Sequence, residues 1–168
     1  MIDRRRALIG TSKIPYNALY WLGNEVTVKT GGWVGTRSSL SYWDQISRRG
    51  RFERAKQSLK LICDSTNMIK SQAIIPALPI ELTGYTKVVA EFEQSGYGTA
   101  TVRLSRCGIQ LVESDIFGDY SGKMITAHEQ TQLTVNISGS PRYVVFWATK
   151  ETFDAPEYTV DIKKIWLE

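Results

Sequence analysis

From residue 23 onwards, hydrophobic and polar residues alternate in short runs separated by glycine, proline, serine and asparagine. A period of two is typical of strands that bury one face, and such punctuation is typical of turns. No segment longer than about ten residues has the spacing of an amphipathic helix. The alternation predicts about eight strands, which we place at residues 24–29, 58–63, 86–93, 99–107, 109–113, 132–138, 142–149 and 158–167.

Local signals refine this prediction. The segment 94–98 contains two glycines and is typical of a hairpin loop. Between Ile162 and Ile165 the alternation breaks, which indicates a β-bulge near Lys163 and Lys164. Because proline cannot donate to a sheet, Pro76 and Pro79 argue against a central strand within residues 68–79. Residues 35–54 form either a long loop or a loop with a short helix around 41–48.

The predicted fold is all-β: a two-sheet antiparallel β-sandwich, jelly-roll-like, with an extended N-terminal arm. The chain has 168 residues, which suits one domain with a substantial core. Residues 1–20 differ in character from the rest and are assigned to the arm. Residues 21–168 are assigned to the sandwich.

The arm is basic and partly apolar. Residues 1–13 hold four basic residues and one acidic residue, a net charge of +3, which leaves only +1 for the rest of the chain. The residues that we expect to anchor it to a partner are Arg4, Arg5, Arg6, Leu8 and Ile9. A partner that orders the arm and a frayed terminus are both compatible with this composition.

The composition narrows the class of protein. Its longest apolar stretch, Tyr143–Ala148, is too short to span a bilayer, and the N-terminal segment lacks the apolar run of a secretion signal. We therefore expect synthesis in a cytoplasm and no membrane partner. The two cysteines, Cys63 and Cys107, lie in strand-like runs, where reduced buried thiols fit better than the alternative, a disulfide between them.

Catalytic and metal-binding motifs are scarce. His128 is the single histidine, which argues against Ser-His-Asp, Cys-His and multi-histidine sites. No glycine pattern matches a phosphate-binding loop. Residues 115–119 contain two aspartates that could bind calcium, but a simple turn explains them better. We expect no enzyme activity, no cofactor and no metal; a glycosidase whose two carboxylates converge from distant strands stays open as a third alternative.

Aromatic residues give a richer signal. Trp147 and Trp166 lie in apolar strands and are expected in the core. Four others fall in expected loops, where they can stack on a sugar or a partner protein, or simply cap the sandwich: Tyr42, Trp43, Tyr97 and Tyr120. A basic cluster at 48–51 admits an acidic polymer, but the nearly neutral domain body argues against nucleic acid as a partner.

Three segments together resemble β-sandwich proteins, akin to carbohydrate-binding modules, in phages, prophages and phage-tail-like particles of Gram-positive bacteria. They are Leu19–Val26 with Thr30–Trp33, Leu82–Val88, and Val160–Glu168. The resemblance implies a virion structural protein, such as a phage tail component, that assembles with other virion or tail proteins as an oligomer. It carries over no functional residues. The alternative function is a carbohydrate-binding module that recognises a host cell-surface glycan.

Overall fold

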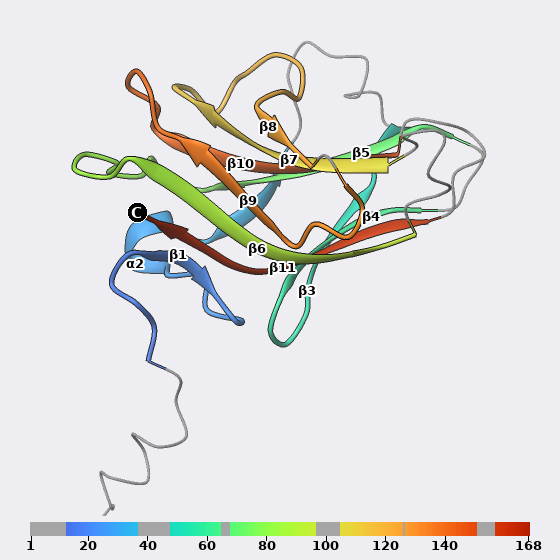
Figure 1. Ribbon diagram of the computed structural model, residues 1–168, viewed down its shortest axis with the longest axis horizontal. Coiled ribbons are helices and arrows are strands. Elements are labelled where there is room, and N and C mark those ends of the chain that lie inside the picture. Colours follow the sequence, from blue (N-terminus) through green and yellow to red (C-terminus); the bar gives the residue numbers. More distant parts are fainter. Residues whose placement is uncertain (1–12, 37–47, 65–67, 97–104, 126, 151–156) are drawn as a thin grey trace, which may run out of the picture.

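The computed structural model describes residues 13–36, 48–64, 68–96, 105–125, 127–150 and 157–168. Two antiparallel sheets pack face to face, which confirms the predicted two-sheet β-sandwich (Figure 1). Sheet A contains β1 (Ala18–Trp21), β3 (Arg51–Arg54), β4 (Leu59–Cys63), β6 (Lys87–Ser95), β9 (Gln132–Asn136) and β11 (Tyr158–Leu167). Sheet B contains β2 (Trp33–Thr36), β5 (Lys70–Pro76), β7 (Ser105–Val112), β8 (Lys123–Met124) and β10 (Tyr143–Lys150).

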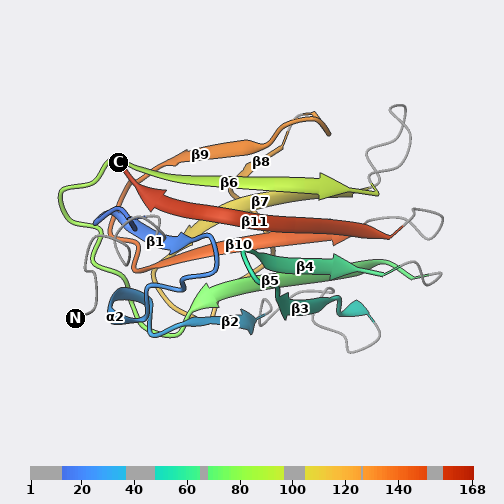
Figure 2. The same cartoon turned by 90° about the horizontal axis from the view of Figure 1, so that it is seen from below.

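Consecutive strands mostly alternate between the two sheets, as in a jelly roll. The strand order is β3-β4-β11-β6-β9 in sheet A and β2-β5-β10-β7-β8 in sheet B (Figure 2). Strand β11 is the centre of sheet A: β6 pairs with one side of it, while β4 and β1 share the other side. The first and last described strands therefore lie side by side.

The main core fills the space between the sheets. It includes Phe92 of β6 and Phe146 of β10, whose rings meet edge to face at 5.5 Å between centroids. The other inward residues of the long strands are aliphatic or aromatic and almost completely buried, among them Leu61, Ile74, Val88, Ile109, Val144, Val160 and Ile165. Their burial follows from the alternation seen in the sequence.

A second, smaller core lies on the outer face of sheet B. The segment 113–122 folds back over this face, and its Phe117 and Tyr120 pack with Trp147. Trp147 is 1% exposed, so it is buried as expected, but outside the main core. Trp166 is only half-buried, because it points from β11 to the outer face of sheet A, where it meets Trp21 edge to face at 6.1 Å. The expectation of a core position for Trp166 is wrong.

Residues 24–29 do not form the predicted strand. Residues Thr27–Thr30 form a single helical turn, α2, instead. The turn starts at Val26 and ends at Gly31, both with left-handed backbone, and the Thr30 hydroxyl donates to the Glu25 carbonyl oxygen at 2.6 Å. These local bonds replace the sheet bonds that the valine–threonine alternation suggested. No helix among the described residues has the length and apolar character needed to cross a bilayer.

Two further expectations fail for identifiable reasons. Residues 70–76 form β5, a strand between β2 and β10, although Pro76 suggested otherwise; this proline is the last residue of the strand, where a missing donor costs least. The expected break at Gly108 does not occur either. Strand β7 runs through it from Ser105 to Val112.

The β-bulge in the last strand is confirmed: the pairing of β11 with β6 shifts between Ile162 and Lys164.

The boundary between arm and sandwich lies earlier in the chain than expected. Ala18, Leu19 and Tyr20 are at most 1% exposed and belong to β1, so the sandwich begins before residue 21.

Candidate binding pocket at one end of the sandwich

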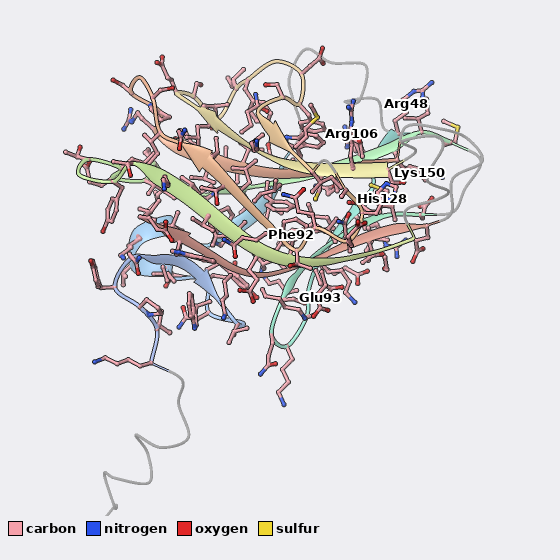
Figure 3. The ribbon with its side chains drawn as sticks, viewed as in Figure 1. Arg48, Phe92, Glu93, Arg106, His128 and Lys150 are labelled. Atoms are coloured by element: carbon pink, nitrogen blue, oxygen red, sulfur yellow. The ribbon has the colours of Figure 1, made fainter. Side chains whose placement is uncertain are left out.

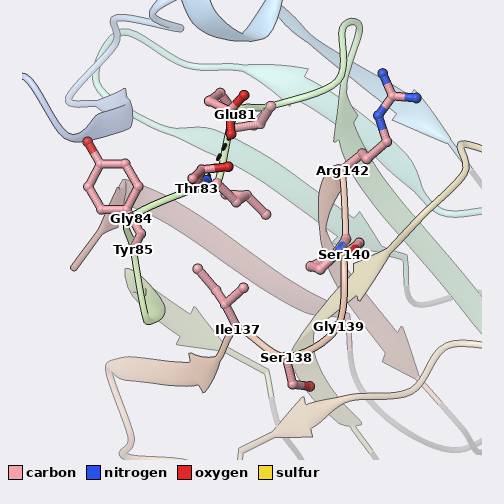
Figure 4. A pocket seen from close by; sticks show the side chains of 12 residues that line it. Glu81, Thr83, Gly84, Tyr85, Ile137, Ser138, Gly139, Ser140 and Arg142 are labelled. Atoms are coloured by element: carbon pink, nitrogen blue, oxygen red, sulfur yellow. Dashed lines mark hydrogen bonds between the residues drawn. The ribbon is translucent and has the colours of Figure 1, made fainter.

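A pocket of about 500 Å³ opens between two connections, the one from β5 to β6 and the one from β9 to β10 (Figure 4). The lining residues are Ile80, Glu81, Leu82, Thr83, Gly84, Tyr85, Ile137, Ser138, Gly139, Ser140, Pro141 and Arg142. Residues 80–85 and 137–142 are far apart in the sequence. They meet because β6 and β9 are paired neighbours in sheet A, with Lys87 opposite Asn136.

Backbone hydrogen bonds hold the two connections in place. The Ile80 N–H donates to the Arg142 carbonyl at 2.7 Å, and the Ile137 N–H donates to the Thr86 carbonyl at 2.8 Å. Within the first connection, the Tyr85 N–H donates to the Leu82 carbonyl at 3.2 Å. Gly84 occupies the third position of this turn with φ of 89°, a conformation that favours glycine. The pocket is thus built on fixed backbone.

The pocket has an apolar floor and a polar rim. Ile80 and Leu82 are each 6% exposed, and Ile137 and Tyr85 pack against the main core. The rim consists of exposed polar side chains: Glu81, Thr83, Ser138, Ser140 and Arg142.

One carboxylate and one guanidinium are the charged groups of this rim. Glu81 Oε1 accepts a hydrogen bond from the Thr83 N–H at 2.9 Å. Hydrogen bonds from the Thr83 hydroxyl and N–H lower the pKa of Glu81, so its carboxylate is ionised at neutral pH. Figure 4 shows the Arg142 side chain on the far side of the pocket from Tyr85, extending away from Tyr85 and Ile137.

The N-terminal segment enters the sandwich at this same end. The Asn17 side chain donates to the Leu167 carbonyl at 2.6 Å, and the Leu167 N–H donates to the Asn17 carbonyl at 2.9 Å. The Glu168 carbonyl in turn accepts from the N–H groups of Thr86 and Lys87, next to the pocket. The pocket, the last residues of β11 and the start of the described chain are therefore neighbours.

Most residues singled out in the sequence lie outside the described parts of the chain. These are the arm residues Arg4, Arg5, Arg6, Leu8 and Ile9 and the loop aromatics Tyr42, Trp43 and Tyr97. Tyr120 is described: its ring stacks on Trp147 at 5.9 Å between centroids, with 9° between the planes. Tyr120 therefore covers part of the smaller core and is not brought together with the pocket.

The opposite end of the sandwich carries basic residues. Lys150, the last residue of β10, is fully buried and lies opposite Lys70 of β5. Burial lowers the pKa of Lys150, and the nearby Asp64 carboxylate acts against that shift. Figure 3 shows Lys150, Arg48 and Arg106 towards this end.

The two cysteines are free thiols buried in the main core. Burial raises the pKa of both Cys63 and Cys107 to about 12. The protonated thiol is therefore the stable form at neutral pH, and neither sulfur is an accessible nucleophile. Across the parts of the chain that the structure describes, histidine, cysteine and acidic side chains do not gather into a group that could hold a metal ion.

Sequence reasoning missed the pocket because its signals are local and common. Each half contains a turn glycine, Gly84 and Gly139, next to hydroxyl residues, a combination typical of any surface turn. Only the pairing of β6 with β9 shows that the two turns adjoin. In the comparisons with known proteins, no family model and no curated protein matches the chain.

Proposed function

We propose that this chain is a non-enzymatic structural protein of a phage virion or phage-tail-like particle, in which the N-terminal arm docks the sandwich onto a larger assembly. In this proposal the arm contacts a protein partner, and the sandwich is the domain that the arm attaches. The proposal includes association with other virion or tail proteins and with further copies of the chain.

The observation that carries this proposal lies where the described chain begins. Ile14 is 37% exposed and Tyr16 is 83% exposed, yet the next residue, Asn17, is fixed to β11 by two hydrogen bonds. Tyrosine is enriched among the residues that protein partners bury, so an exposed tyrosine beside a fixed attachment point suits a docking contact. Residues 1–13 carry a net charge of +3, and the exposed Tyr16 extends the docking segment from these residues to the edge of the sandwich.

Co-sedimentation with particles tests the proposal. The wild-type chain should be recovered in particles released from cells that encode it. Replacing Arg4, Arg5 and Arg6 by serine should lower recovery at least tenfold, and Tyr16→Ser should lower it severalfold, because both remove docking contacts.

A matched control removes the same charge from the domain body. Lys56, Lys87 and Lys123 are exposed residues of the sandwich, and their triple replacement by serine should leave recovery unchanged. Equal recovery of the arginine variant and the lysine variant would refute docking by the arm. Absence of the wild-type chain from the particles would refute the structural role altogether.

A further inference from the structure

We propose that the pocket between residues 80–85 and 137–142 binds a short neutral saccharide. This inference goes beyond the assembly role, because it concerns a different surface and a different class of ligand. It also assigns a glycan to residues other than the loop aromatics that the sequence suggested.

The size and rigidity of the pocket suit a small ligand. Its volume of about 500 Å³ lies within the roughly 300–1,000 Å³ usual for small-molecule sites. The backbone bonds from Ile80 to Arg142 and from Ile137 to Thr86 fix its walls before a ligand arrives. A preformed site avoids much of the ordering cost of binding.

The distribution of side chains matches the surface of a sugar ring, which has apolar C–H faces and hydroxyl groups around its edge. The half-buried Ile137 and Tyr85 offer apolar surface to a ligand, and the buried Ile80 and Leu82 lie beneath them. Rim hydroxyls can both donate and accept hydrogen bonds, and the Glu81 carboxylate accepts them. A hydrogen bond from a sugar hydroxyl to an ionised carboxylate is among the stronger kinds.

Charge points to a neutral ligand. Glu81 supplies the carboxylate of this rim, and the Arg142 side chain extends away from Tyr85 and Ile137 (Figure 4). The carboxylate is ionised and exposed, and it disfavours a uronic acid or phosphate placed beside it. An anionic polymer would find no excess of positive charge here.

A protein partner fits the pocket less well. Protein-binding hot spots are enriched in tryptophan, tyrosine and arginine and poor in serine and threonine. Three of the five rim side chains are hydroxyls, at Thr83, Ser138 and Ser140, while Arg142 and Tyr85 are the lining residues of the enriched kinds. The large apolar side chains of the pocket, Ile80 and Leu82, are already buried.

The test is a glycan array displaying neutral oligosaccharides alongside uronic-acid and phosphate-bearing ones, probed with the intact chain. The strongest neutral oligosaccharide is then titrated calorimetrically against the wild type and variants. Glu81→Gln and Thr83→Ala should each weaken binding about tenfold, since the first replaces an ionised acceptor by a weaker amide oxygen and the second removes a hydroxyl group. Ser95→Ala and Glu129→Gln, at exposed positions outside the pocket, should leave the affinity unchanged.

Binding of neutral sugars that depends on the pocket residues supports the proposal. No binding at millimolar sugar, binding of acidic glycans alone, or equal affinity in pocket and control variants would overturn it. A wild-type chain that binds no sugar, together with pocket variants that are lost from the particles, would also overturn it, in favour of a protein partner. The glycan array uses the isolated chain and no particle. Its result can therefore be interpreted even if the proposed assembly role is wrong.

Discussion

Gly108 of β7 and Trp147 of β10 face each other across paired strands, and the indole occupies the space where a side chain at residue 108 would begin. A Cβ atom there would lie 2.4 Å from Trp147 Cζ2 and 2.8 Å from the Lys123 carbonyl oxygen. The ring is held in this place by its Nε1–H, which donates to the Ser121 carbonyl at 2.8 Å, and by the stacked ring of Tyr120. The glycine is therefore what allows segment 113–122 to close over the outer face of sheet B.

Gly108→Ala should destabilise the protein by about 2–3 kcal/mol, because the added methyl group pushes the indole off the strand. Urea unfolding followed by circular dichroism gives the change in free energy, and tryptophan emission reports on the displaced ring. Gly118 is the matched control, since a Cβ there meets no atom within 4 Å and its φ is not positive. If Gly108→Ala were as stable as Gly118→Ala, the packing described here would be wrong.

Glu25 and Arg54 close the edge of the sandwich beside β2 and β3. Glu25 Oε2 accepts from Arg54 Nε at 2.8 Å, Glu25 Oε1 accepts from the Trp33 N–H at 2.8 Å, and Arg54 also donates to the Trp33 carbonyl. Arg54→Met should cost about 1 kcal/mol. Arg51→Met is the control: its pair with Glu53 is half-exposed and 3.4 Å long, and its loss should cost little in comparison.

The pair of Glu25 and Arg54 should also make the free energy of unfolding depend on pH in the acidic range. Burial alone would raise the pKa of Glu25, but hydrogen bonds from Arg54 and Trp33 outweigh it and the pKa is lowered. Its contribution to stability is therefore present above the ordinary carboxyl pKa and is lost as pH falls through the folded value. The difference in unfolding free energy between wild type and Arg54→Met should shrink below about pH 4. A difference that is the same at neutral and acidic pH would contradict the assignment.

The buried thiols should make the protein sensitive to alkali. Unfolded cysteines lose their protons near their ordinary pKa, whereas folded Cys63 and Cys107 keep theirs up to about 12. Because the unfolded chain then binds fewer protons, stability should fall as pH rises from about 8 to about 10. Urea midpoints across this range measure the fall, and replacing both cysteines by alanine should reduce it. A disulfide reagent should label both thiols only after unfolding; rapid labelling of the folded chain would contradict their burial.

The fold could be read from the sequence wherever alternation decides which face is buried. Strand β11 shows this best, since even its bulge was visible as a break between Ile162 and Ile165. The errors arose where other effects dominate. Residues 24–29 alternate like a strand, but the hydrogen bond of the Thr30 hydroxyl stabilises a helical turn there. Gly108 suggests a break between two strands, but it is a strand residue whose missing side chain leaves room for the Trp147 ring.

The candidate site could not be predicted in the same way. A pocket is formed by the approach of distant segments, and neither Glu81 nor Ser140 carries a local pattern that distinguishes it from other turn residues. Tyrosine and tryptophan in expected loops were predicted as contacts because they are rarer than serine or glycine and combine an apolar ring with a polar group. Of the four loop aromatics, Tyr42, Trp43, Tyr97 and Tyr120, the structure describes Tyr120 alone. The Tyr120 ring contacts Trp147 and Phe117.

Docking by the arm is tested most directly by deleting residues 1–12, so that the chain begins at Lys13. The described hydrogen bonds of the sandwich begin at the turn that joins Pro15 and Ala18, so the shortened chain should keep its circular dichroism spectrum and urea midpoint. The measurement is the amount of shortened chain in purified particles, relative to the full-length chain expressed at the same level. We predict a folded protein that is absent from the particles. Recovery of the folded, shortened chain at the full-length level would contradict the account.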